Sequence, residues 1–460
     1  MKIELAPVAL PEFGLPADDV AIPGSTYAGR LADLESRYVQ RGYDLTVVYA
    51  DREHSANIAY LTNYDPRFEE ALLILKPGRK PTLLVGNEGM AYAKAAIPTE
   101  VEFVLFQPLS LLSQPRGESV SLQEALVSAG VARGMRIASV GWKYYSTQET
   151  PEPARWIEIP AFIVDTLRQL GCSVENATDI LMHPERGMRA VSDVDQLAAF
   201  EAGASFSSQA VHDILFGVRP GMSEFEGIQL ARLNGWPISM YPILLGGERT
   251  DLGLGSPSHR KLRRGDRVTT CIGLWGGNTS RAGFLVESAN ELPAGARDYV
   301  DKLVTPYVRS AMAWYETIGI GVTGGEVYDA VHRHVGDPFF GVKLNPGHLI
   351  HLDEWVSSPI SKGSGARLSS GMALQLDIIP ATGTEYWTSN VEDGIALADQ
   401  ALRESLARKY PAAWDRIQRR RAFMKEALGI SLKPEVLPFS NIPCYLPPFW
   451  LSPGKAMRRS

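Results

Sequence analysis

The sequence has few of the features that mark secreted, nucleic-acid-binding or membrane-spanning proteins. Its three cysteines, Cys172, Cys271 and Cys444, lie far apart, which favours a reducing compartment. The formal net charge of -6 lacks the basic excess of nucleic-acid binders. No run of about eighteen apolar residues occurs, and the start, MKIELAPVALPEFGLP, has proline and acidic residues where a secretory signal needs a basic start. We expect a cytoplasmic protein with no nucleic-acid or membrane partner.

The length and composition indicate a multidomain globular protein. A chain of 460 residues is too long for one ordinary domain, and a hydrophobic content of 45% is enough to bury large cores. Up to about residue 180, apolar strand patterns such as 45–49, 71–75, 81–85 and 137–141 alternate with helical ones, including a helix from Tyr27 to near Gly42. This alternation predicts an α/β domain with a mixed or parallel sheet.

The second half of the chain has a different pattern. A long helix is predicted from Ser192, which we expect to cap it, to Val218. Beyond residue 240, strands and glycine-rich turns predict an antiparallel sheet flanked by helices. We expect an α/β domain over residues 1–187, a second domain over 188–433, and a tail over 434–460. The proline- and aromatic-rich tail either packs over a surface or subunit interface or is disordered.

Several short motifs resemble the creatinase/aminopeptidase P (M24) superfamily, whose catalytic domain has the pita-bread fold. Gly42-Tyr-Asp44 and Asn57-Ile-Ala-Tyr-Leu-Thr62 resemble its N-terminal domain. Met188-Arg-Ala-Val-Ser-Asp193 and Arg219-Pro-Gly-Met-Ser-Glu224 resemble the first long helix of the second domain and its end. Gly265-Asp266, Gly347-His348, Ser370-Gly-Met372 and Val391-Glu-Asp393 follow in the order of the family. The resemblance implies a creatinase-like N-terminal domain, then a pita-bread domain.

The resemblance also implies that the metal site of the family is incomplete. Family peptidases hold two metal ions with two aspartates, one histidine and two glutamates. The matching positions here are Cys271, Ala282, His348, Asp377 and Glu392. Two close divalent ions need several anionic oxygens, and a thiol and a methyl group replace two of them. We therefore expect no dinuclear centre.

Two interpretations of the four remaining donors stay open. Cys271, His348, Asp377 and Glu392 would form a mixed set that can hold one zinc ion. Alternatively, Cys271 is a small buried residue, as free cysteines often are, and no cofactor binds. The absence of a cofactor is the expectation, and one divalent ion is the alternative.

The segment from Gly347 to Trp355 contains the densest group of ionisable residues. It includes His348, His351 and Glu354, and the first of these is expected near Asp377 and Glu392. Two neighbouring buried carboxylates raise each other's pKa and can give an acid or base that works near neutral pH, with histidine as partner. The other interpretation of His348 is a hydrogen-bonded core histidine. The candidate catalytic residues are His348, Asp377, Glu392, His351 and Glu354.

Candidate substrate-binding residues surround these positions. Arg67 resembles an arginine that in creatinase-like dimers reaches the neighbouring active site, and a guanidinium suits a carboxylate. Creatinase has its general base near the position of Leu254, so His259 would reach the pocket only if this loop folds differently. The candidates are Arg67, Trp275, Arg281, Trp387 and His259, each with a structural role as the alternative.

Three functions are consistent with this pattern. The first is a metal-independent, creatinase-type hydrolase of a C–N bond in a small carboxylate-bearing compound. The second is a non-catalytic relative that binds a ligand or partner. The third is a mononuclear metal hydrolase or lyase, resembling Xaa-Pro peptidases or dimethylsulfoniopropionate lyases. The resemblance also implies a homodimer that acts on a small molecule.

Overall fold

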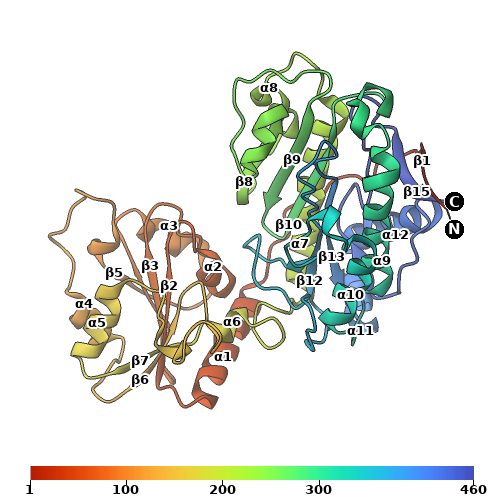
Figure 1. The fold of residues 1–460 in the computed structure, drawn as a ribbon. Helices are drawn as coiled ribbons and strands as arrows, with labels where there is room; N and C mark the ends of the chain where they lie inside the picture. The colour runs from red at the N-terminus through yellow and green to blue at the C-terminus, as the bar shows by residue number, and fades with distance from the viewer. Residues whose placement is uncertain (1) are drawn as a thin grey trace. The chain divides into compact units, whose positions relative to one another are not determined.

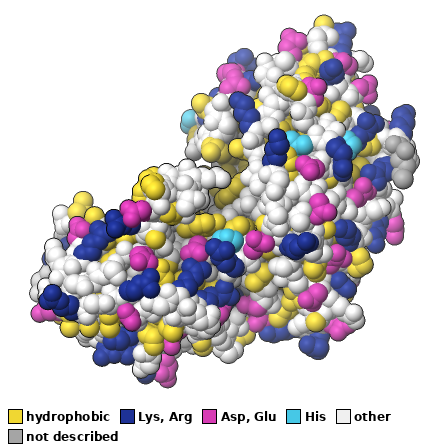
Figure 2. Space-filling model, turned by 60° about the horizontal axis from the view of Figure 1, so that its bottom comes forward, with side chains coloured by type: hydrophobic (Ala, Val, Ile, Leu, Met, Phe, Trp, Pro, Cys, Tyr) yellow, Lys and Arg dark blue, Asp and Glu magenta, His cyan; other side chains and the backbone are white. Residues whose placement is uncertain are grey.

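The computed structural model describes residues 2–460 and divides into two compact units. The N-terminal unit is Ile22–Arg189, and the C-terminal unit combines the chain up to Ala21 with Ala190–Ser460. The boundary after Arg189 lies two residues beyond residue 187, where the sequence predicts that the first domain ends. Within residues 2–460, no helix combines the length and the apolar character needed to cross a bilayer. On the face shown in Figure 2, basic and acidic side chains are interspersed.

The N-terminal unit is an α/β domain built on a six-stranded mixed sheet of order β5-β4-β3-β2-β6-β7 (Figure 1). The pairs β2–β3 and β3–β4 are antiparallel, and the other three pairs are parallel. Buried aliphatic side chains of the strands pack against α4 and α5. The elements are α1 (Gly24–Gln40), β2 (Leu45–Ala50), α2 (Ala56–Thr62), β3 (Ala71–Leu75), β4 (Thr82–Val85), α3 (Gly89–Ala96), β5 (Glu102–Leu105), α4 (Leu122–Ser128), β6 (Arg136–Val140), α5 (Ala161–Gln169), β7 (Ser173–Asn176) and α6 (Asp179–Met182).

The C-terminal unit is a curled antiparallel sheet of order β11-β12-β13-β10-β9-β8, with β14 paired to β13. Helix α7 packs against β9 and β10, and the helical pair α9 and α10 belongs to the same unit (Figure 1). The elements are α7 (Val194–Gly217), α8 (Glu224–Ile228), β8 (Ile238–Gly246), β9 (Arg267–Leu274), β10 (Gly277–Phe284), α9 (Thr305–Thr317), α10 (Gly324–Val335), β11 (His348–Leu349), β12 (Ala373–Asp377), β13 (Asn390–Leu397), α11 (Gln400–Lys409), α12 (Pro411–Glu426) and β14 (Val436–Pro438).

The start of α7 differs by one residue from the sequence prediction. Asp193, not Ser192, is the N-cap, and its carboxylate accepts a hydrogen bond from the backbone N–H of Gln196. The backbone N–H of Ser192 instead donates to the carbonyl of Gly371. Aspartate and serine are equally good caps, so the sequence alone did not distinguish the two positions.

The two ends of the chain meet in a small sheet. β1 (Ile3–Pro7) pairs antiparallel with β15 (Lys455–Arg459), and Figure 1 shows both termini at this place. The segment before β15 is buried in the C-terminal unit. The backbone N–H of Trp450 donates to the carbonyl of Phe284, and the backbone N–H of Phe284 donates to the carbonyl of Pro448. The tail is therefore folded onto β10, and its aromatic side chains form part of the core of this unit.

Candidate active-site cavity

Four neighbouring strands place one residue each in a row across the curled sheet. Cys271 on β9 pairs with Ser280 on β10, Ser280 pairs with Glu392 on β13, and Glu392 pairs with Asp377 on β12. Directly paired residues point to the same face of a sheet, so these side chains gather at one level. The pairing explains why residues more than one hundred positions apart in sequence form one cluster.

These residues form part of the wall of a cavity of about 930 Å³, and every residue that lines it belongs to the C-terminal unit. Glu354 and Asn278 line the same end as the row. Large apolar side chains also line the cavity and are exposed to solvent: Leu254 is 82% exposed, and Leu344 is 55% exposed. The cavity therefore combines an acidic end with apolar walls, as small-molecule sites often do.

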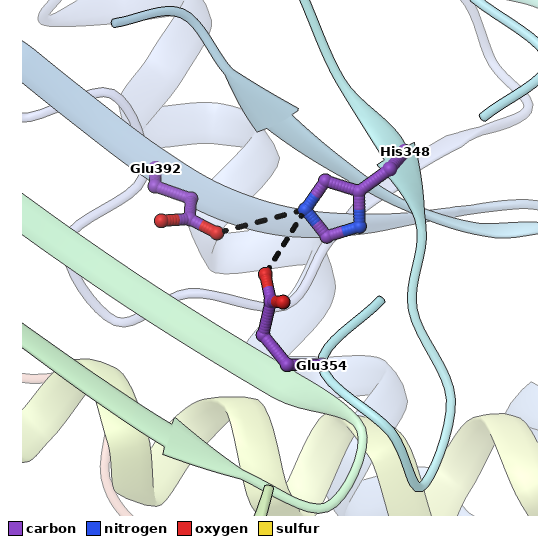
Figure 3. Close-up of side chains that lie close together, drawn as sticks. All are labelled: His348, Glu354 and Glu392. Atoms are coloured by element: carbon purple, nitrogen blue, oxygen red, sulfur yellow. Dashed lines mark ion pairs between the residues drawn. The ribbon is translucent and has the colours of Figure 1, made fainter. Parts of the chain in front are cut away.

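His348 lies behind the carboxylates and contacts two of them. Its Nε2 lies 3.3 Å from Oε1 of Glu354 and 3.8 Å from Oε1 of Glu392 (Figure 3). The imidazole is fully buried and stacks on the indole of Trp355, with ring centroids 4.2 Å apart. His348 is not among the residues that line the cavity, whereas Glu354 and Glu392 both line it.

Asn278 connects the thiol to the carboxylates. Its Oδ1 accepts a hydrogen bond from Sγ of Cys271 at 3.1 Å, and its Nδ2 donates to Oε1 of Glu392 at 2.9 Å. Nδ2 also lies 3.4 Å from Oε1 of Glu354. Burial, followed by Glu392 and Glu354, raises the pKa of the Cys271 thiol well above its usual value. The thiol is therefore neutral and serves as a hydrogen-bond donor at neutral pH.

The burial of the cluster shifts the proton affinities of its other members. Burial lowers the pKa of His348, but the nearby carboxylates of Glu354 and Glu392 outweigh it and raise the pKa to about 10. Burial raises the pKa of Glu392, and the nearby Asp377 raises it further. Burial also raises the pKa of Asp377, against the attraction of His348. The site thus holds a charged imidazolium beside two carboxyl groups that titrate closer to neutral pH than usual.

The donor set does not fit a pair of metal ions. Ala282 supplies no ligand atom, and the neutral Cys271 thiol already bonds Asn278. Within residues 2–460, three groups can converge on one ion: single ligand atoms of His348, Glu354 and Glu392 all lie within 4.8 Å of one another. This set differs from the four donors expected from the sequence, because Glu354 joins it while Cys271 and Asp377 do not.

Three expected substrate-binding residues do not line this cavity. Arg281 is fully buried and forms an ion pair with Asp393 at 2.8 Å, because odd-numbered residues of β10 face away from Ser280 and Ala282. Trp275 is half-buried in the turn after β9. His259 is exposed, and its ring packs edge-on against Phe225. None of these three side chains is therefore placed to contact a ligand in this cavity.

The other candidates divide between the two units. Trp387 lines the cavity, whereas His351 is fully buried with its ring edge-on to Phe200 and does not. Arg67 belongs to the N-terminal unit, where its Nε lies 3.0 Å from Asp65.

Asn278 and Arg267 are among the polar residues of the cavity that the sequence motifs did not indicate. The alternation of a strand would have found Arg267, because residues 267, 269 and 271 lie on one face of β9. Asn278 gave no comparable signal, since its role depends on the pairing of β9 with β10.

Comparisons with known proteins agree on the fold. Neither a family model nor a curated protein sequence matches the chain. Solved structures do match: an Xaa-Pro dipeptidase from Bacillus anthracis is 15% identical, with a TM-score of 0.61 over 82% of this chain and 96% of that one. A prolidase from Thermococcus sibiricus is 18% identical, with a TM-score of 0.63 over 81% and 95%. Dipeptidase PepE from Mycobacterium ulcerans is 21% identical, with a TM-score of 0.58 over 82% and 94%.

The chain therefore has the pita-bread architecture of Xaa-Pro dipeptidases, prolidases and aminopeptidases P, preceded by the α/β domain that accompanies it. The resemblance found in the sequence motifs is confirmed at the level of fold. At identities this low the likeness concerns the fold alone, so function has to be argued from the cavity.

Proposed function

We propose that this chain is a metal-independent hydrolase that cleaves a C–N bond in a small carboxylate-bearing compound. The observation that carries the proposal is the carboxyl pair Asp377 and Glu392, which face each other from β12 and β13 in the cavity wall. Oδ1 of Asp377 is buried and has no hydrogen-bond partner among the described residues, so it is available to a ligand.

The two carboxyl groups suit complementary proton transfers. Burial raises the pKa of both groups, and the charge of Asp377 raises the pKa of Glu392 further, so the pair can hold one proton near neutral pH. We assign Asp377 as the base that accepts a proton from water as the water oxygen attacks the substrate carbon. We assign Glu392 as the acid that protonates the nitrogen as the C–N bond breaks.

His348 is a positioning residue in this scheme. Its imidazolium lies at ion-pair distance from Glu354 and Glu392 and holds both carboxylates toward the cavity. Replacing it would leave the buried Glu392 without its cation, which raises the pKa of Glu392 and misplaces the acid.

The test is a screen of guanidino compounds and dipeptides for release of amine or urea, followed by variants on whichever substrate turns over. We expect His348→Ala to lower kcat/KM at least about a hundredfold, as general acid–base effects do. The acid limb of the pH profile, where kcat/KM falls on acidification, should move to higher pH in this variant. A chelator should leave the wild-type rate unchanged. His259→Ala, at an exposed position outside the cavity, is the matched control. Full activity in His348→Ala would refute the scheme, and no turnover would favour a non-catalytic binding protein.

A mononuclear metal enzyme is the second candidate. It is favoured by one observation, the convergence of His348, Glu354 and Glu392 within 4.8 Å. An imidazole and two carboxylates would hold a divalent ion, which would act as a Lewis acid toward a bound substrate. Elemental analysis of protein purified without added metal distinguishes the two functions: about one equivalent supports the metal enzyme, and less than about a tenth rules it out.

A further inference from the structure

Arg267 is the one positively charged side chain among the described residues that line the cavity. It is the first residue of β9, and its guanidinium lies over the indole of Trp387, 5.6 Å from the ring centroid. Its only ion-pair partner among the described residues is Asp251, at 3.1 Å. The Asp251 side chain is 67% exposed, and an ion pair with such an exposed partner is worth little, so a ligand carboxylate can replace it.

Arg267 lies at one end of a face of β9, and the row of Cys271, Ser280, Glu392 and Asp377 crosses the sheet at the other end of that face. Arg267, Thr269 and Cys271 alternate on β9 and all line the cavity, and Cys271 marks the level of Glu392 and Asp377. At about 3.3 Å of rise per residue, four residues separate the two levels by about 13 Å between Cα atoms. The arginine side chain shortens the gap that a ligand has to bridge.

The stretch between the two ends is lined by small side chains. Thr269 is paired with Ala282 on β10, and both line the cavity. Ala282 therefore leaves room where a larger side chain would separate the acidic end from Arg267. The unpartnered Oδ1 of Asp377 supplies an acceptor at the acidic end, in a side chain that is only 8% exposed.

From these observations we infer that the cavity binds a zwitterion, with a cationic nitrogen at Glu354, Asp377 and Glu392 and a carboxylate at Arg267. A guanidinium binds a carboxylate through two parallel hydrogen bonds, and buried carboxylates favour a cation over a neutral group. Arg267 is thus the specificity-determining residue for the acidic end of the ligand. Whether this ligand is also a substrate rests on the proposed function, but its binding can be measured without turnover.

The experiment is calorimetric titration of the full-length protein with the ω-amino acids 4-aminobutanoate, 6-aminohexanoate and 8-aminooctanoate. Hexylamine and hexanoate, which carry one charge each, are the reference probes. We expect one of the ω-amino acids to bind more tightly than both references, because only a zwitterion satisfies both ends. Equal affinities for all probes would overturn the inference.

Three variants test the role of Arg267. Arg267→Gln should weaken binding of the best ω-amino acid about tenfold and leave hexylamine unchanged, since one charge-assisted contact is lost. Asp251→Asn should strengthen the same probe, because it removes the competing anion. Arg264→Gln is the matched control: Arg264 lies three residues before Arg267 but pairs with Glu287 and Glu291 outside the cavity.

The outcomes separate this inference from the proposed function. Arg267-dependent binding of a zwitterion, together with no turnover of any guanidino compound or dipeptide in the screen, supports the binding site and counts against the hydrolase. Turnover of a substrate at the same rate in wild type and Arg267→Gln, with unchanged KM, refutes the role of Arg267 and leaves the hydrolase standing. Unchanged zwitterion affinity in Arg267→Gln refutes the inference whatever the activity.

Discussion

At the residue scale, two side chains set this cavity apart from one that holds two metal ions. Cys271 and Ala282 stand where the M24 resemblance places two aspartates, and they lie on neighbouring strands β9 and β10. Their effect extends beyond the lost ligands. The neutral thiol becomes a donor to Asn278, and the methyl group opens space between the acidic end and Arg267.

The double variant Cys271→Asp/Ala282→Asp tests whether these two positions are the reason that the cavity does not fit two metal ions. We expect it to bind about two equivalents of Mn²⁺ or Co²⁺, because two carboxylates are restored beside His348, Asp377 and Glu392. Binding is measured by calorimetry and elemental analysis, with the wild-type protein as reference. Two equivalents of metal on the wild-type protein would contradict our account of the site.

The pH dependence of activity follows from the buried carboxyl groups. Asp377 has to be ionised to act as base, and burial raises its pKa above 3.8, so kcat/KM should fall on acidification at a higher pH than for an ordinary aspartate. The charge of Glu354 raises this pKa further. Glu354→Gln should therefore move the acid limb to lower pH, whereas Glu385→Gln, exposed and outside the cavity lining, should not move it. A limb shifted to higher pH in Glu354→Gln would contradict the assignment.

At the scale of elements, β10 shows that a functional prediction depends on which face of the sheet each residue of a strand occupies. Ser280 and Ala282 face the cavity, while Arg281 between them is fully buried on the other face. There it pairs with Asp393 and donates to the carbonyls of Tyr445 and Ile442. The arginine thus joins β10 to β13 and to the C-terminal segment, which is a structural role.

Removing this buried arginine should be costly. Arg281→Ala leaves Asp393 as an uncompensated buried charge, which typically costs about 3–5 kcal/mol in the free energy of unfolding. Arg264→Ala removes an exposed pair with Glu287 and should change the free energy of unfolding far less. Urea denaturation of both variants measures the difference. Similar small losses in the two variants would show that the Arg281–Asp393 pair does not hold the strands together.

The sequence predicted the histidine and the carboxyl groups at the acidic end of the cavity better than the residues that surround them. His348, Asp377 and Glu392 occupy motif positions in the order of the family, and Glu354 lies close to the first of them in sequence, so the motifs were enough to propose them together. Arg281 was predicted to bind substrate and Arg267 was not, because the difference between them depends on which face of a strand points inward. That face follows from strand register, which the motifs did not provide.

At the scale of the whole molecule, the alternation of helices and strands and the order of the motifs were sufficient to predict the fold. They did not predict that the first residues belong to the same unit as the last, because β1 and β15 pair across the full length of the chain. A pairing between segments about 450 residues apart leaves no local pattern in a sequence.

The association state remains a prediction from the family resemblance. We expect a homodimer, with a mass in light scattering of twice the chain mass of 50.4 kDa. A change of Arg67 to alanine tests whether this partly exposed arginine takes part in the association. A monomeric mass at micromolar concentration would refute the dimer.

The terminal strand pair also bears on how the protein is made. On the ribosome, β1 emerges long before its partner, so its hydrogen-bonding edge stays open until β15 has been synthesised about 450 residues later. The region Ile22–Arg189 can fold before that point, but the C-terminal unit can be completed only once β15 is available. A chain that stops before Lys455 would therefore leave β1 without its neighbour.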